Sequence, residues 1–237
     1  MNALCEIKSK FVNSGVAAEM VYRTLREAIL TGVLGPGTRI KESDISEQLG
    51  VSRTPVREAI GRLRAEGLIQ SLPTVGTVVS DFSSEHVLAT YVPRAVLEGA
   101  AARLCATSAT DAEIASLERT LEVMEEPETM GSLDNLSDAN FAFHELIVMF
   151  SRNDYLRQLL QQIWAIVKMC RVSSLMYPGR VQEAMAEHRR ILDAIKRRDS
   201  RQAEEAARAH IEKAHETRLR MVTDSRRSVG QPLSWGE

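Results

Sequence analysis

Apolar residues recur at helical spacing in three segments of the first 80 residues, and breaks that contain glycine or proline separate these segments. The predicted helices cover 17–31, 42–49 and 54–66. Gly50 follows the second helix, where left-handed backbone costs glycine little. Ser52 stands where an N-cap of the third helix is expected, and Pro55 lies in the first turn of that helix, where a missing N–H is tolerated.

A β-branched stretch after the third helix predicts a hairpin. Its two short strands are expected at 68–71 and 77–80, with a turn between Pro73 and Gly76. A helix, a helix-turn-helix motif and a hairpin in this order predict a winged helix-turn-helix domain over 16–80, with the motif itself at 42–61.

From Ser83 onward the pattern is helical almost without interruption. Six helices are predicted, at 84–107, 111–125, 134–151, 154–172, 180–198 and 200–222. The connections between them are short, which favours an all-α antiparallel bundle over 81–223. The ends, 1–15 and 224–237, have no sustained periodicity and are expected to be mobile. The fold class is therefore mainly α.

Composition is that of a globular protein, with 44% hydrophobic and 26% charged residues. No apolar run approaches the roughly 20 residues that a membrane span needs, so no membrane partner is expected. The three cysteines have neither metal nor redox spacing and are expected to be reduced thiols of a cytoplasmic protein. The net charge of −2 excludes a broadly basic protein that coats nucleic acid.

Two arginines point to DNA recognition. Arg53 and Arg57 are four residues apart near the start of the third helix, which is where a recognition helix presents side chains to the major groove. Arginine there can bind guanine through two hydrogen bonds. Ser52 and Thr54 carry hydroxyls suited to phosphate, and Gly76 would let the wing approach the minor groove.

Two other interpretations of this helix remain open. It could be a surface helix with solvated arginines, or a winged helix that contacts another protein. The DNA-binding hypothesis requires that 54–66 face outward and that carboxylates of the same molecule do not neutralise its arginines.

The string VSRTPVREAIGRLRAEGLI, preceded by TGVLGPGTRIKESDISEQLG, resembles the winged helix of GntR-type transcriptional regulators over about 16–80. The resemblance implies a homodimer that binds an inverted repeat in double-stranded operator DNA, one half-site per subunit. By position, Arg53 and Arg57 would contact bases and Gly76 would lie in the minor-groove wing. Members of the FadR branch often carry a further arginine at the position of Ser43, so one base contact would differ here.

Histidines at helical positions of the second domain could converge. Asn140 and His144 are four residues apart on one helix, and His188 and His210 lie on the next two helices. Three imidazoles and one oxygen ligand form a plausible site for a divalent ion such as zinc or nickel. Each histidine taken singly is more often structural or exposed.

Residues 84–222, from Arg94-x-x-x-Glu98 through EHRRILDAIKRRD and AHIEKA, resemble the FCD effector domain of the FadR branch, and six helices fit its shorter, VanR-like form. In many such domains an Asp and three His hold a metal, and a small organic acid binds against it. Asn140 replaces that Asp. Because an amide oxygen is neutral, weaker metal binding is expected, and an effector that binds without metal remains an alternative.

Arg94 and Arg171 are candidates for binding an effector carboxylate, since a guanidinium matches its geometry. Arg94 could instead pair with Glu98 within one helix. The predicted function is a DNA-binding transcriptional repressor whose operator affinity a small carboxylate metabolite controls. A metalloenzyme built on the bundle is the rival, but no paired Glu-x-x-His motifs, Ser/His/Asp order or phosphate loop are found.

Overall fold

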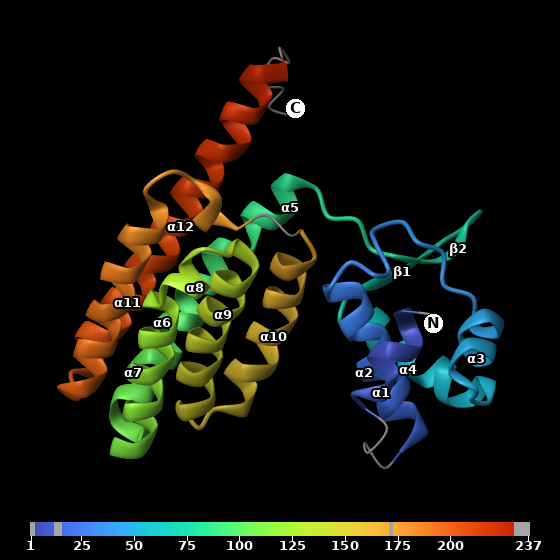
Figure 1. The fold of residues 1–237 in the computed structure, drawn as a ribbon, viewed down its shortest axis with the longest axis horizontal. Helices are drawn as coiled ribbons and strands as arrows, with labels where there is room; N and C mark the ends of the chain where they lie inside the picture. The colour runs from blue at the N-terminus through green and yellow to red at the C-terminus, as the bar shows by residue number, and fades with distance from the viewer. Residues whose placement is uncertain (1–2, 12–15, 171–172, 230–237) are drawn as a thin grey trace. The chain divides into compact units, whose positions relative to one another are not determined.

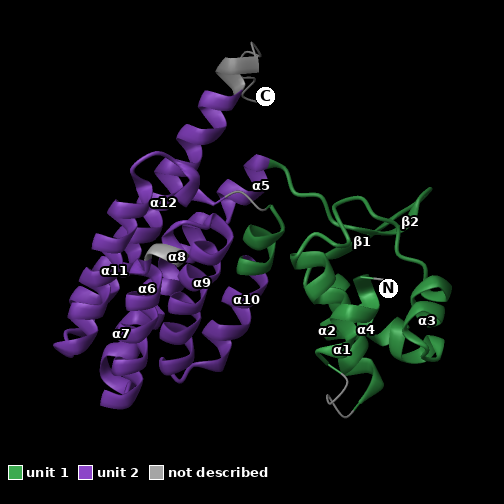
Figure 2. Cartoon of the chain, viewed as in Figure 1, with its two compact units in different colours: residues 1–83, 164–171 green, residues 84–163, 172–237 purple. Residues whose placement is uncertain are grey.

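The computed structural model describes residues 3–11, 16–170 and 173–229. The chain divides into two compact units (Figure 2). Unit 1 comprises 1–83 together with 164–171, and unit 2 comprises 84–163 and 172–237.

Three helices and a hairpin form most of unit 1 (Figure 1). The helices are α2 (Ala17–Leu30), α3 (Glu42–Leu49) and α4 (Arg53–Ala65), within one residue of the ranges that apolar periodicity predicted. Their apolar faces form one core, which contains Val21 and Leu25 of α2, Ile45 of α3, and Val56 and Ile60 of α4. The mainly α fold with a winged helix-turn-helix is confirmed.

The wing is the antiparallel pair β1 (Ile69–Leu72) and β2 (Gly76–Val79). The segment before α3 extends this sheet, because Ile40 N–H donates to the carbonyl of Thr77 (2.8 Å) and Arg39 forms a bridge with Val78. Strand β2 is thereby paired on both of its edges, with β1 on one side and this segment on the other.

The expectation of a mobile start is wrong for part of 1–15. Residues Ala3–Ser9 form helix α1, and Leu4 and Ile7 are buried in the core of unit 1. Lys8 donates a hydrogen bond to the last carbonyl of α3, that of Leu49 (2.7 Å). A helix of about two turns carries too few apolar positions to show a period, so only the packing reveals it.

Unit 2 is all helical. Its helices are α5 (Ser84–Ala89), α6 (Tyr91–Ser108), α7 (Asp111–Glu125), α8 (Pro127–Met130), α9 (Leu133–Phe150), α11 (Arg180–Lys196) and α12 (Ser200–Val229), with a 3-10 turn η1 (Ser174–Met176) and most of α10 (Asp154–Met169). In the bundle α6 packs against α12, α9 and α11, and α7 packs against α9 and α11 (Figure 1).

The predicted helix at 84–107 is two helices, which meet at Thr90. Pro93 is the reason, because proline lacks the N–H that would bond the carbonyl of residue 89 and its ring clashes with that carbonyl. The expected mobile tail begins too early, since α12 continues to Val229. Residues 230–237 lie outside those described. Within the described part of the chain, no helix is long and apolar enough to cross a membrane.

We expect Leu4→Ala to lower the free energy of unfolding by about 2–5 kcal/mol, because it leaves a cavity between α1 and the core of unit 1. Urea denaturation measures the change. Glu6→Ala, at an exposed position of the same helix, is the control and should change stability by less than about 0.5 kcal/mol. Equal stability of the two variants would show that α1 does not pack as described.

Candidate functional site

Helices α3 and α4 form the helix-turn-helix. Gly50 caps α3 with left-handed backbone (φ 62°), where a side chain would be strained. Ser52 is the N-cap residue of α4, as expected, but its side chain makes no capping hydrogen bond. The hydroxyl of Ser52, like that of Thr54, is on an exposed residue at the start of α4, which is where helix N-termini bind phosphate.

Arg53 and Arg57 lie on the exposed face of α4, while Val56, Ala59 and Ile60 are on the buried face. The helix therefore faces outward, as DNA recognition requires.

Arg57 is nevertheless paired within the molecule. Its Nη2 lies 3.0 Å from Oε2 of Glu42, at the start of α3. This hydrogen bond raises the pKa of Arg57 and lowers that of Glu42. The side chain of Arg57 remains 72% exposed. Water and salt weaken so exposed a pair, so a DNA phosphate or base can replace Glu42.

The remaining predicted DNA contacts lie on the same unit. Ser43 is exposed on α3, and its hydroxyl donates to Asp44 (2.9 Å). Gly76 begins β2 with φ 89°, and a Cβ there would lie 3.8 Å from the guanidinium of Arg39. Arg39 is exposed and brings a cation to the wing that the sequence analysis missed. In the sequence, the only indication of this role was the position of Arg39 just before the helix-turn-helix motif.

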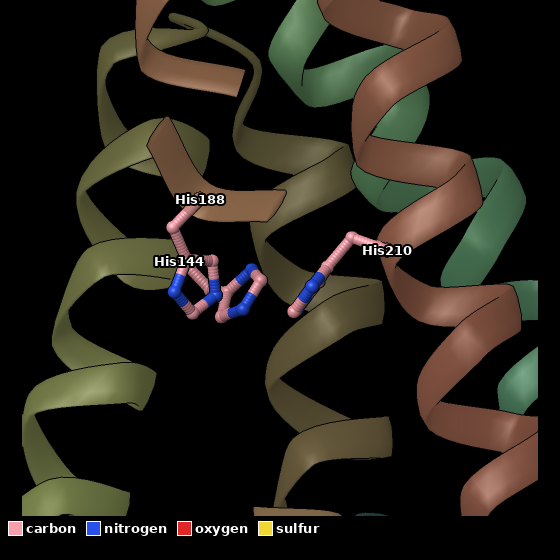
Figure 3. Close-up of side chains that lie close together, drawn as sticks. All are labelled: His144, His188 and His210. Atoms are coloured by element: carbon pink, nitrogen blue, oxygen red, sulfur yellow. The ribbon is translucent and has the colours of Figure 1, made fainter. Parts of the chain in front are cut away.

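The structure brings His144 of α9, His188 of α11 and His210 of α12 together inside unit 2 (Figure 3). All three are buried, His188 completely. One ring nitrogen from each lies within 4.8 Å of the others. The imidazoles point toward one another from three different helices (Figure 3).

Two buried carboxylates contact these histidines, and the contact between Glu187 and His210 is a hydrogen bond. Oε2 of Glu98, on α6, lies 2.9 Å from Nδ1 of His144, and Oε2 of Glu187, on α11, lies 2.7 Å from Nδ1 of His210. Histidines that bind metals are commonly held in this way through the ring nitrogen that does not bind the ion. Nε2 is therefore the ligand atom that both residues would offer.

Several of these nitrogen atoms lack hydrogen-bond partners among the described residues: Nε2 of His144 and both ring nitrogens of His188. Buried polar atoms are rarely left unpaired. Ring nitrogens bound to one tetrahedral zinc are about 3.3 Å apart, so small rotations would bring this cluster to the required spacing. The residues fit a divalent metal with nitrogen ligands.

Burial lowers the pKa of His188 and of His210 well below the usual value, and the neighbouring imidazoles and Arg180 lower both further. Both rings are therefore neutral near pH 7. A neutral imidazole has the lone pair that a metal needs, so protons do not compete for these two ligands at that pH.

The outcomes for the other residues predicted to bind the metal or the effector differ from one residue to the next. Asn140 lies one turn before His144 on α9 and is half-buried. Arg94 is buried, but its Nε binds Oε1 of Glu98 at 2.8 Å, so the alternative of a pair within α6 is confirmed. Arg171 lies outside the described residues.

Sequence reasoning missed three members of this buried network: Glu98 as a partner of His144, Glu187, and Arg180. Glu187 had a signal, since it directly precedes His188 in the sequence. No sequence signal pointed to Arg180, because its partner Glu187 is seven residues away and lies beside it only once the helix has formed.

A winged helix with outward-facing arginines, joined to a helical bundle, defines a DNA-binding transcriptional regulator. Two family models match the chain: residues 17–79 match the gntR family of bacterial regulatory proteins, and residues 89–213 match the FCD domain. The chain belongs to the GntR family and carries an FCD domain.

Relatives agree with this assignment. The chain is 32% identical to the HTH-type transcriptional regulator YdhC of Bacillus subtilis over 80% of this chain and 85% of that protein. It is 28% identical to the transcriptional repressor RspR of Escherichia coli over 84% of this chain and 87% of the relative. These proteins are transcriptional regulators, and the protein described here is a regulator rather than an enzyme.

Solved structures share the fold. The E. coli protein McbR/YncC superposes with a TM-score of 0.71 at 22% identity, covering 87% of this chain and 99% of that one. A GntR regulator from Rhodococcus sp. RHA1 follows with a TM-score of 0.66, covering 85% and 97%.

We expect the metal-free protein to lose stability as the pH falls below about 6.5. Because the pKa of His188 and His210 is lowered on folding, the unfolded chain binds more protons there, and the stability present above the unfolded pKa is lost as the pH decreases. The slope would reach about 1.4 kcal/mol per pH unit for each histidine.

Urea denaturation in the presence of a chelator, from pH 7.5 to 5, measures this slope. The double variant His188→Gln/His210→Gln should have a flatter profile, whereas His86→Gln, at an exposed histidine, should keep the wild-type profile. The same slope in the double variant would contradict the assignment.

Proposed function

We propose that this regulator is a repressor that binds an inverted-repeat operator as a homodimer, and that a small carboxylate metabolite bound in the FCD domain controls its affinity for that operator. A divalent ion, zinc or nickel, held by the three histidines, forms part of the effector site. The observation that supports the sensing part is the cluster of buried imidazoles, whose ring nitrogens include several with no hydrogen-bond partner among the described residues. A repressor acts on chromosomal DNA, so the cytoplasm is its place of action.

The DNA-binding part is supported by the exposed face of α4. Arg53 and Arg57 would contact bases, Ser52, Thr54 and Ser43 would contact the backbone or nearby bases, and Gly76 would allow the wing into the minor groove. An inverted repeat requires two copies of the motif, which a homodimer provides. RspR of E. coli is described as a repressor, and this supports the same direction of control here.

The metal part is supported by the chemistry of the donors. His144, His188 and His210 would supply three imidazoles, and Asn140 would add an amide oxygen from the turn before His144. A neutral amide is a weaker ligand than a carboxylate, so moderate affinity is expected. Bound at this position, the ion would supply an electrophilic centre for an effector carboxylate.

Control of operator affinity follows from linkage. An effector that binds one state of the dimer better shifts the population toward that state, and operator affinity changes by the same factor. A coupling of about 1–3 kcal/mol is typical of such systems. This scheme allows the effector either to release the regulator from the operator or to strengthen its binding to the operator.

Arg57→Ala should weaken binding to an operator selected from random DNA by the wild-type protein by about tenfold or more, because one arginine–guanine contact is lost. Arg53→Ala should act similarly. Fluorescence anisotropy at a fixed salt concentration measures the affinity.

The matched control is Arg23→Ala. Arg23 is also an exposed arginine of unit 1 paired with a glutamate, Glu19 at 2.6 Å, but it lies on α2. This variant should bind the operator within about threefold of wild type, the loss expected when only a distant charge is removed. Equal affinity of Arg57→Ala and wild type would exclude base contact by Arg57.

His188→Ala should abolish or strongly weaken zinc binding, because it removes one of the three imidazoles. Elemental analysis after equilibration with zinc and dialysis is expected to find about one ion per wild-type chain and almost none in the variant. His86→Ala, which removes an exposed histidine, should keep the metal. Wild-type protein that takes up no metal in excess zinc would refute the three-histidine site.

A further inference from the structure

Arg180 is the first residue of α11, and its side chain is only 1% exposed. A guanidinium carries five N–H donors and a permanent charge. Burial of such a group is costly unless its donors are bonded.

Only part of this guanidinium is satisfied. Nη2 donates to Oε2 of Glu187 at 2.6 Å. Nη1 lies 3.9 Å from a carboxylate oxygen of Glu183, which is within ion-pair range but too far for a hydrogen bond, and the side chain of Glu183 is 57% exposed. Nε and Nη1 have no hydrogen-bond partner among the described residues. Two buried cationic donors are left for a ligand.

These donors are next to the histidine cluster. The same oxygen of Glu187 that accepts from Arg180 also lies 2.7 Å from Nδ1 of His210. Arg180 is close enough for its charge to lower the pKa of both His188 and His210, after burial and the neighbouring imidazoles. One carboxylate thus joins the arginine to the imidazoles.

Arg94, one of the two arginines predicted from the sequence to bind an effector carboxylate, has other partners. Its Nε binds Glu98, and its guanidinium lies 5.2 Å from the centre of the Tyr91 ring. None of its nitrogen atoms is among the buried unpartnered atoms of the described residues. Arg180 is thus better placed to bind an added anion.

Charge balance points to an anion as well. Among the side chains of unit 2 whose burial the structure describes, the buried ionised ones are Arg94, Arg180, Arg218, Glu98 and Glu187, with an excess of one positive charge. Nε of Arg218 is also unpartnered among the described residues. A divalent ion at the histidines would enlarge this excess, and a bound anion would reduce it.

Solvent reaches the edge of this network. A groove of about 660 Å³ between α11 and α12 is lined by Glu187 and His210, together with the cationic Arg190, Arg197 and Lys213 and the acidic Asp193 and Glu205. A small ligand can therefore approach Glu187, the partner of Arg180, from solution.

We infer that Arg180 is the anion-recognition residue of the FCD domain: it binds one carboxylate of a small di- or hydroxycarboxylate, while Glu187 holds its Nη2. Nε and Nη1 lie on different edges of the guanidinium plane, so a carboxylate at either edge gains an unused donor. The second oxygen group of the ligand would lie toward the histidines. This inference rests on the proposed function, because it names the residue that recognises the effector.

The test uses the full chain, both with a chelator and loaded with zinc, and four probes: acetate, malonate, succinate and citrate. Calorimetry is expected to show that at least one di- or tricarboxylate binds more tightly than acetate. Arg180→Gln should lower that affinity at least tenfold, as expected when a buried charged hydrogen bond is lost. Arg180→Lys should be intermediate, because lysine keeps the charge but not the planar donors.

Arg201→Gln, at an arginine of α12 whose side chain is 88% exposed, is the control and should bind the probes as wild type does. Should Arg180→Gln fail to fold, the wild-type protein still gives an answer. Its Arg180 Nε–H resonance, identified by its absence from the spectrum of Arg180→Lys, should shift during titration with the best probe.

Two results would overturn the inference. One is wild-type protein that binds none of the probes up to about 10 mM, with or without zinc, which would mean that water satisfies the unused donors. The other is unchanged probe affinity in both Arg180 variants. Either result with intact operator binding refutes this inference alone, whereas wild-type protein that selects no DNA sequence would refute the proposed function.

Discussion

Two buried carboxylates, Glu98 and Glu187, hold the polar interior of the FCD domain together. Each joins an arginine to a histidine: Glu98 contacts Arg94 and His144, and Glu187 contacts Arg180 and His210. Buried charges are tolerated only when they are paired and hydrogen-bonded. The pairs run from α6 to α9 and from α11 to α12, so they also set where the imidazoles lie.

Under the proposed function, this arrangement would make the positions of helices depend on what the histidines bind. A ligand shared by the three imidazoles would contact α9, α11 and α12 at once, and Glu98 would carry its effect to α6. Under the proposed function, effector binding would therefore favour one packing of these helices over another. Such a difference in affinity between two states is what a regulator needs in order to couple its ligand to DNA.

Ion pairs play opposite roles in the two units. The pair between Arg57 and Glu42 is exposed, and water weakens it, so the arginine remains available to DNA. The pair between Arg180 and Glu187 is buried and cannot exchange its partner for water. The same two kinds of side chain therefore give an adaptable contact on α4 and a fixed one on α11.

The sequence by itself determined the helix-turn-helix and the helical bundle, because helical periodicity and local motifs depend on neighbours within a few residues. The three histidines could be grouped from the sequence only through the resemblance to the FCD domain, and the packing of α9, α11 and α12 brings them together. The helix break before Pro93 could also have been predicted from the sequence, but a single helix was predicted there. Only the tertiary structure decided that α1 packs on the core, that Glu42 pairs with Arg57, and that Glu98 contacts His144. Those partners lie between 15 and 46 residues apart in sequence, and no local pattern records a contact that the packing of separate helices creates.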